Sequence, residues 1–368
     1  QAPELKEVGA GIQISSNGTR VLYALGLEDA LKRVQVLPQR RVIRHWATGE
    51  TWNWFDLGAV TAQRYGTPHV MLHRGDLHGV LLKACQDHPL VELRVSSEVA
   101  GYEQDGKGVA ARLADGQFVR GAALVGADGL WSNVRRQMIG DSARVSGHTT
   151  YRSVIPTEQM PEDLRWNAAT LWAGPKCHIV HYPLSGWKVF NLVVTYHNDA
   201  PEPVAGKPVP VEEVRRGFGH VCERAQNIIR HGRDWHMWVL CDRDPVNDWI
   251  DRRVALLGDA AHPMLQYMAQ GACMAMEDAV TLGQALRVHG NDWAKALDLY
   301  QQARVARTAR IVLSGREMGR ISEKEERRQL PPMRLPGLEG EFGTDTGRLA
   351  HGQDERTGRR RHATPGRR

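Results

Sequence analysis

The sequence predicts an α/β fold whose two domains are interleaved along the chain. An apolar run over 254–257 stops at residues 258–259, and a turn rich in small residues then leads into a helix. A second apolar run ends in the same way at residues 128–129. Between these two strand–turn–helix units, residues 150–240 carry period-two runs rich in Trp, His, Pro and Thr. Such runs are typical of a predominantly antiparallel sheet.

The same patterns predict where the domains begin and end. The strand–turn–helix units place one α/β domain over 1–148 and 241–290, and the period-two runs place an antiparallel β-sheet substrate domain over 149–240. Helical periodicity predicts closing helices over 291–321. Residues 322–368 are rich in Arg, Gly and Pro and lack periodicity, so we expect them to be disordered.

Local signals assign the elements of the first domain in chain order. A helix is expected over 12–33, entered through the turn at Ser15–Gly18. Short strands are expected within 35–70, followed by a helix that begins at His73 and has Asp76 near its N-terminus. The pattern then predicts a meander of strands over 91–95, 108–113 and 118–125.

Composition excludes several classes of protein. A hydrophobic content of 42% and a charged content of 24% are ordinary for a soluble globular protein. No stretch approaches the ~18 uncharged apolar residues that span a bilayer, and no signal peptide is visible at the start. The five cysteines are scattered without a CxxC pair, which indicates neither a disulfide framework nor a metal site. We therefore expect a reducing, cytoplasmic setting.

The net charge of +6 does not indicate a nucleic-acid-binding protein. Residues 323–368 hold eleven Lys and Arg against eight Asp and Glu, so they supply half of that charge. The remaining residues are close to neutral, and their basic side chains are not interleaved with aromatic ones in a single stripe. We expect no nucleic-acid partner.

The segment 253–286 carries the most specific chemical signal. The Asp259 carboxylate follows a strand and can accept hydrogen bonds from the hydroxyls of a polyol. The free N–H groups of a helix that opens at Gln270, Gly271 and Ala272 can face an anion. This arrangement suits a polyol or phosphate with negative charge developing nearby.

The segment resembles the second flavin-binding motif of the single-component aromatic hydroxylases, the FAD-dependent monooxygenases typified by p-hydroxybenzoate hydroxylase. The resemblance covers about residues 4–321. It implies a Rossmann-like, p-hydroxybenzoate hydroxylase-type FAD-binding domain interleaved with the antiparallel sheet. It also implies that FAD is held by the residues that open this motif, namely Gly258, Asp259, Gln270, Gly271 and Ala272.

Two further segments match motifs of this family. Residues 126–136, GADGLWSNVRR, resemble its middle motif, which implies that Asp128 and Gly129 touch FAD and the nicotinamide nucleotide and that Arg135 contacts a phosphate. The structural alternative is a strand–turn–helix in which Asp128 acts as a helix cap. Arg74 matches an arginine that lies against the cofactor, and the alternative for it is a surface arginine at a helix start.

Both ends depart from the family pattern. In the family, a complete βαβ unit with a GxGxxG turn precedes the segment that here begins near Glu7, and Gly9-Ala10-Gly11 follows no strand that could replace it. We therefore expect the first βαβ unit to be absent, and FAD binding to be weakened as a result. The 322–368 tail is expected to be either a native disordered segment or a foreign, out-of-frame one.

Residues 174–184, GPKCHIVHYPL, give the sharpest indication of the substrate. In a strand, alternate side chains project from one face, and these include His178 and Tyr182, an imidazole and a phenol that can hold a phenolic ring. The stretch resembles the 3-hydroxybenzoate 6-hydroxylases, in which the His and Tyr at these positions line the active site. The same resemblance implies that Gln266, in the loop MLQY, binds the substrate.

The resemblance implies a complete reaction. NADH or NADPH reduces FAD, O2 is activated on the reduced flavin, and one oxygen atom passes to the aromatic ring. His178, with an ordinary pKa of ~6.5, is expected to take the proton of the 3-hydroxyl. This raises the electron density at the para carbon, so 3-hydroxybenzoate would give 2,5-dihydroxybenzoate (gentisate). A salicylate-type decarboxylating hydroxylase and a truncated, inactive chain are the alternatives, and a homodimer stays open.

Overall fold

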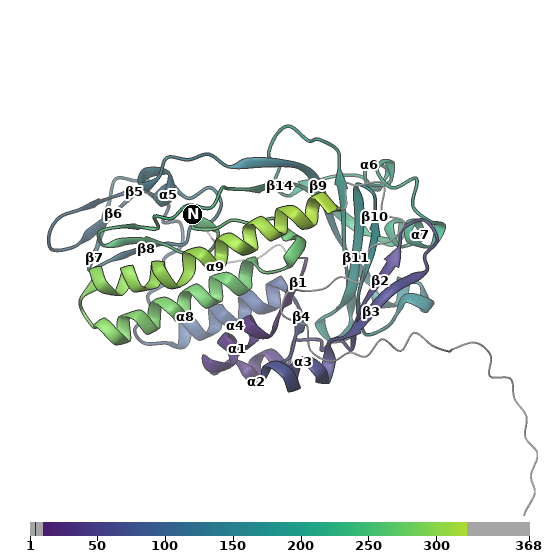
Figure 1. The fold of residues 1–368 in the computed structure, drawn as a ribbon, viewed down its shortest axis with the longest axis horizontal. Coiled ribbons are helices and arrows are strands. Elements are labelled where there is room, and N and C mark those ends of the chain that lie inside the picture. Colours follow the sequence, from purple (N-terminus) through teal and green to yellow (C-terminus); the bar gives the residue numbers. More distant parts are fainter. Residues whose placement is uncertain (1–3, 5–9, 322–368) are drawn as a thin grey trace, which may run out of the picture. The chain divides into compact units, whose positions relative to one another are not determined.

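The computed structural model describes residue 4 and residues 10–321. Predictions about the tail over 322–368 and about Gly9 lie outside the described residues. Within the described part, the strands form four sheets, with two, eight, three and three strands. Figure 1 shows the eight-stranded sheet on one side of the helices that follow the two strand–turn motifs.

The α/β part of the chain supplies most of the long helices. Antiparallel β1 and β4 form the two-stranded sheet, and helices follow each of them. The elements of this part are β1 (Gly11–Ile14), α1 (Ser16–Ala24), α2 (Glu28–Lys32), α3 (Gly58–Tyr65), β4 (Val70–His73), α4 (Arg74–Asp87), α5 (Asn133–Met138), α8 (Gly271–His289) and α9 (Trp293–Ile321).

Two parallel strands bring the two predicted motifs together. In β8 (Leu124–Gly126) and β16 (Val254–Leu256), Gly126 lies opposite Leu256. β15 (Ile250–Asp251) adds an antiparallel edge to β16. Because β8 and β16 run in the same direction, the residues that follow them emerge at the same edge of the sheet. The predicted α/β class, with a strand ending before each motif, is confirmed.

The eight-stranded sheet is antiparallel except where β2 pairs with β10. The predominantly antiparallel sheet is therefore confirmed, but it also takes in residues 40–56, which the sequence placed with the α/β domain. In spatial order its strands are β13 (Lys207–Pro208), β14 (Arg233–Asp242), β9 (Arg144–Pro156), β12 (Val189–His197), β11 (Cys177–Leu184), β10 (Ala168–Gly174), β2 (Arg40–His45) and β3 (Thr51–Asp56).

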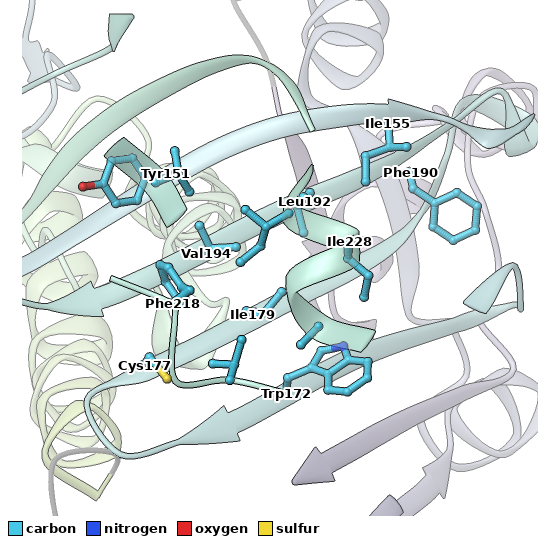
Figure 2. Close-up of a cluster of buried hydrophobic side chains, with 14 of the residues drawn as sticks. Tyr151, Ile155, Trp172, Cys177, Ile179, Phe190, Leu192, Val194, Phe218 and Ile228 are labelled. Carbon is cyan, nitrogen blue, oxygen red and sulfur yellow. The ribbon is translucent and has the colours of Figure 1, made fainter. Parts of the chain in front are cut away.

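One face of this sheet is apolar and covered by helices. Because side chains alternate along a strand, β11 and β12 present one residue in two to this face, and α6 (Val211–Arg216) and α7 (Glu223–His231) pack on it. Figure 2 shows the resulting cluster. Its labelled members are Tyr151, Ile155, Trp172, Cys177, Ile179, Phe190, Leu192, Val194, Phe218 and Ile228.

The opposite face of the same strands is polar. His178 lies across from Thr195, which lies across from Thr150, and Tyr182 lies across from Asn191. Residues directly opposite each other share a face, so the predicted placement of His178 and Tyr182 on one face is confirmed. The polar side chains of this face, called the polar face below, are His148, Thr150 and Arg152 on β9, His178 and Tyr182 on β11, and Asn191, Thr195 and His197 on β12.

Two predictions about local structure were wrong. The single helix over 12–33 is a strand and two helices, because residues 11–14 pair with β4. The strand over 91–95 does not form, and Leu93 is 42% exposed there. The strand predicted over 108–113 is confirmed as β6 (Val109–Leu113), and it pairs with β5 (Val99–Gln104) and β7 (Phe118–Gly121) in a three-stranded sheet. The strand predicted over 118–125 is divided between β7 and β8, which lies in another sheet.

Candidate active site

Asp128 and Asp259 emerge side by side from the parallel strands. The Leu257 N–H donates to the Gly126 carbonyl oxygen at 2.9 Å, which continues the pairing of β16 with β8 up to the two motifs. Each aspartate follows within three residues of this contact. The structure therefore brings together two acidic residues that are 131 positions apart in the sequence.

A buried ionic network fixes the turn at Gly258. This glycine has φ +61°, a left-handed conformation that favours glycine, and its N–H donates to Asp278 Oδ2 at 3.0 Å. The same carboxylate contacts His262 Nε2 at 2.5 Å and Arg304 Nε at 2.7 Å. His262 thus helps to hold the turn together through Asp278.

Asp259 is exposed to solvent, yet protein surrounds it on most sides. Burial among these atoms raises the pKa of the Asp259 carboxyl, while His262 and Arg74 act in the opposite direction. Arg74, the first residue of α4, therefore lies within electrostatic range of Asp259. The two cofactor residues predicted from separate segments belong to one region.

The N-terminus of α8 adjoins the same carboxylate. A Cβ placed on Gly271 would lie 3.9 Å from Asp259 Oδ1. Among the described residues no side chain caps this helix, and its first turn holds no acidic residue, so the N–H groups near Gly271 and Ala272 face outward with the positive end of the helix dipole.

Two hydrogen bonds hold the Gln270 side chain at this helix start. Its Nε2 donates to Ser15 Oγ at 3.1 Å, and Asn17 Nδ2 donates to its Oε1 at 3.1 Å. These bonds tie α8 to α1. An acceptor for polyol hydroxyls, a cation and helix N–H donors thus meet in one region, and this set of groups fits the ribityl chain and the anionic edge of FAD.

Arg135 does not occupy the expected phosphate-binding position. Its side chain is fully buried, and its Nη1 donates to the carbonyl oxygens of Ala260 and Ala261 at 3.0 and 2.6 Å. Its Nε and Nη2 pair with Asp141 at 2.9 and 2.7 Å. Because these protein acceptors already use its guanidinium, Arg135 fastens α5 to the turn after Asp259 and has no donor to offer a phosphate.

The hydrogen bonds of Asp128 match the alternative in which it acts as a helix cap. It accepts from Ser132 Oγ at 2.5 Å and from the Asn133 N–H at 2.8 Å, while Ser132 caps α5 by accepting from the Arg135 N–H. Gly129 has φ +79° and open space at the position of a Cβ. Asp128 remains solvent-exposed, so capping and contact with a cofactor are compatible.

His178 is buried on the polar face, close to other imidazoles. Burial, and in addition His148, lower the pKa of His178 to about 4, below the ordinary value of ~6.5 expected from the sequence. The physical reason is that a low-dielectric surrounding disfavours the charged ring. His178 is therefore neutral near pH 7 and has a free lone pair that can accept a proton.

Tyr182 lies two residues further along β11, among cations. Burial raises the pKa of its phenol, and Arg152, Arg41 and Arg74 act in the opposite direction. A Cβ on Gly11 would lie 2.7 Å from the Tyr182 hydroxyl, so β1 passes directly over this ring. The phenol stays protonated at neutral pH and can donate a hydrogen bond.

Gln266 spans the polar face from above. Its Nε2 donates to Thr150 Oγ1 and to Thr195 Oγ1, both at 2.9 Å, and its Oε1 accepts from Arg152 Nη2 at 3.1 Å. The Arg152 guanidinium also lies 5.3 Å from the centre of the Trp238 ring. The predicted substrate residues His178, Tyr182 and Gln266 thus share one face, with a cation at its side.

Several residues of this region could not be identified from the sequence. Arg152 and the two threonines lie in ordinary strand patterns, and only the register of β9 against β12 places them beside His178. Tyr267 belongs to the predicted loop MLQY, but nothing in that loop indicates its contacts with the histidines of the polar face. A polar residue at every second position of β9 was the one available signal.

The described residues contain neither a membrane-spanning helix nor a cluster of metal-binding side chains. No helix there is long and apolar enough to cross a membrane. In the same part of the chain, His, Cys, Asp and Glu form no group of three or more that could hold a metal ion.

The chain is similar to proteins of known activity. The family described as FAD binding domain matches residues 10–314. The chain is 51% identical to 3-hydroxybenzoate 6-hydroxylase 1 of Aquipseudomonas alcaligenes over 312 residues, which cover 84% of this chain and 79% of that protein. It is 47% identical to 3-hydroxybenzoate 6-hydroxylase of Polaromonas naphthalenivorans (strain CJ2), with 87% and 80% covered.

A solved structure shares the fold. Klebsiella pneumoniae HpxO, solved in complex with FAD and uric acid, superposes with a TM-score of 0.78 at 26% identity. The match covers 87% of this chain and 81% of that chain.

Proposed function

This chain belongs to the class A FAD-dependent aromatic hydroxylases, and on that basis we propose that it converts 3-hydroxybenzoate to 2,5-dihydroxybenzoate with NADH or NADPH and O2. The observation that carries the proposal is the position of His178 and Tyr182 on one polar face, with Gln266 bonded across it. Relatives that carry the name 3-hydroxybenzoate 6-hydroxylase, at up to 51% identity, support the same substrate.

The residues at the ends of β8 and β16 fit the cofactor. We assign the ribityl hydroxyls to Asp259, the anionic edge of the ring to the N-terminus of α8 at Gly271 and Ala272, and a further contact to Arg74. Asp128 and Gly129 line the same edge of the sheet. When bound, the flavin accepts a hydride from the nicotinamide nucleotide and activates O2. The helix N-terminus stabilises the negative charge that reduction creates.

His178 activates the aromatic ring. Its neutral imidazole accepts the proton of the substrate 3-hydroxyl, and this raises the electron density at the para carbon, which is carbon 6. Because burial holds the pKa of His178 at about 4, the transfer depends on negative charge arriving with the substrate carboxylate and the reduced cofactor. Nearby negative charge favours the protonated imidazole.

Tyr182 and Gln266 orient the substrate. The Tyr182 phenol stays protonated because burial raises its pKa, so it donates a hydrogen bond to an oxygen of the substrate. Gln266 is held in place by hydrogen bonds with Thr150, Thr195 and Arg152. Its fixed side chain restricts the orientation of the substrate ring. The sheet itself excludes water from the ring during oxygen transfer.

A single reaction tests the proposal. The purified chain, supplied with FAD, is incubated with 3-hydroxybenzoate, O2 and NADH or NADPH, and the product is identified by mass and by co-elution. The expected product is 2,5-dihydroxybenzoate with its carboxylate retained. A 2,3- or 3,4-dihydroxybenzoate would contradict the regiochemistry. Loss of the carboxylate would favour the salicylate-type reaction, and consumption of NADH without hydroxylated product would contradict the proposal.

A further inference from the structure

The residue after Gln266 is enclosed by three histidines of the polar face. The Tyr267 hydroxyl lies 2.5 Å from His148 Nδ1 and 3.1 Å from His197 Nε2. The rings of these two histidines stack, with centroids 3.6 Å apart and planes 4° from parallel. The Tyr267 ring also lies 5.4 Å from the ring of His178.

The Tyr267 hydroxyl has one hydrogen for its two imidazole partners. A phenol carries one O–H, so Tyr267 donates to one of the two imidazoles and accepts from the other. Both imidazoles are buried, and burial, with His148 and His178 in addition, lowers the pKa of His197 to about 3. His197 is therefore neutral near pH 7, and the Tyr267 hydroxyl joins the two stacked rings through hydrogen bonds.

Backbone from a distant helix completes the enclosure. A Cβ placed on Gly319 of α9 would lie 3.0 Å from Tyr267 Cε2 and 3.4 Å from His148 Cε1. Contacts of 3.0 Å to a Cβ force a neighbour to shift. Gly319 therefore leaves the space that the Tyr267 ring occupies, and the backbone of α9 confines the ring there.

We propose that Tyr267 is a positioning residue for His178: the stacked His148–His197 pair and Gly319 fix the phenol, and its ring sets the orientation of the His178 imidazole toward the substrate. This inference rests on the proposed function in so far as it concerns hydroxylation. The claim that Tyr267 sets the orientation of the His178 ring can be tested without substrate or cofactor. Neither stacked histidine needs to exchange a proton with the substrate in this arrangement.

Tyr267→Phe tests the proposal, because it keeps the ring and removes its hydroxyl. We expect the rate of hydroxylation to fall about 10-fold, since a small misplacement of a reacting group is costly. Flavin reduction by NADH should stay within about two-fold of the wild type, because His178 has no part in hydride transfer. The fraction of NADH recovered as product should fall together with hydroxylation.

A second readout is independent of activity. The side-chain 15N signals of His178, assigned by their loss in His178→Gln, should shift in Tyr267→Phe because the imidazole changes its orientation and tautomer balance. Gly319→Ala should shift the same signals by displacing the ring. Gly283→Ala on α8, where a Cβ meets nothing within 4 Å, serves as the matched control and should leave them unchanged.

The outcomes separate the two proposals. If the wild type forms no 2,5-dihydroxybenzoate, the proposed function fails, and the 15N signals still decide the position of His178. If the wild type is active but Tyr267→Phe hydroxylates at the wild-type rate with unchanged His178 signals, the positioning role of Tyr267 is overturned. Equal loss in both half-reactions would overturn it as well, because that result indicates a general structural defect.

Discussion

Arg135 Nη1 lies 2.6 Å from the carbonyl oxygen of Ala261, so one buried guanidinium joins α5 to the turn that follows Asp259. The two motifs that resemble flavin-binding segments are therefore held together by hydrogen bonds of the Arg135 side chain as well as by the pairing of β8 with β16. Arg135, the arginine of the middle motif, therefore stabilises the turn of the second motif.

Replacing Arg135 tests this supporting role. Arg135→Leu should lower the free energy of unfolding by about 3 kcal/mol, because it removes one partner of a buried ion pair and leaves the Ala260 and Ala261 carbonyls without a donor. Chemical denaturation measures the change. Arg136→Leu, at an exposed position one residue away, should change stability by less than about 0.5 kcal/mol. If Arg135→Leu keeps the wild-type stability but binds FAD more weakly, the result would favour the interpretation in which Arg135 contacts a phosphate.

Asp259 is predicted to contribute to cofactor affinity. Asp259→Ala removes an acceptor for the ribityl hydroxyls, so the dissociation constant of FAD should rise roughly 10- to 100-fold, the range for a hydrogen bond to a charged group. Titration of flavin fluorescence measures it. The exposed Asp248 provides the control, since Asp248→Ala should bind FAD like the wild type. Equal affinities for all three chains would exclude Asp259 from the site.

Gln266 offers a test of substrate charge. Gln266→Glu places a carboxylate where Arg152 Nη2 now donates at 3.1 Å, so the new side chain pairs with Arg152 and repels an anionic substrate. The KM for 3-hydroxybenzoate should rise about 10-fold or more, while that for NADH should stay unchanged. Gln266→Leu should raise the same KM less, because it adds no charge. A lower KM in Gln266→Glu would indicate that no carboxylate binds nearby.

The buried imidazole on the other face predicts acid sensitivity. Burial, with Arg44 and Arg224 in addition, lowers the pKa of His181 to about 3, and within the described residues neither ring nitrogen has a hydrogen-bond partner. The unfolded chain takes up this proton near pH 6.5 and the folded chain does not. Stability should therefore fall as the pH decreases from about 6.5 toward 3, by up to about 1.4 kcal/mol per pH unit from this residue.

His181→Leu should reduce that dependence. Leucine carries no titrating group and packs beside Trp172 and Phe190, whose rings lie 6.4 and 6.5 Å from the imidazole. The drop in thermal midpoint between pH 7 and pH 4.5 should be smaller than in the wild type. His88→Leu, at an exposed site, should keep the wild-type drop. If His181→Leu is as acid-sensitive as the wild type, His181 does not contribute.

Local patterns were sufficient for the parts of the site that lie on continuous segments. The strand, the Gly258-Asp259 turn and the start of α8 follow one another within twenty residues, so their geometry is dictated by nearby chain. The same holds for His178 and Tyr182, because the alternation of a single strand places them on one face. Each of these predictions needed no knowledge of distant contacts.

Long-range partners were beyond the same reasoning. The acceptors of Arg135 at Ala260 and Ala261 lie 125 and 126 residues away, and nothing in GADGLWSNVRR distinguishes a buried arginine from one that faces a phosphate. β2 belongs to the eight-stranded sheet through parallel pairing with β10, and no turn between the two strands in the sequence predicts this pairing. The depressed pKa of His178 also depends on burial by neighbours that only the fold supplies.

The central claim is that His178 accepts the substrate proton beside a flavin seated at α8. Rapid mixing of His178→Asn separates the two half-reactions. We predict that flavin reduction by NADH in the presence of 3-hydroxybenzoate stays within about two-fold of the wild type, while hydroxylation of the ring slows by about 100-fold, as expected for loss of a general base. Equal slowing of both half-reactions, or unchanged hydroxylation, would contradict the account.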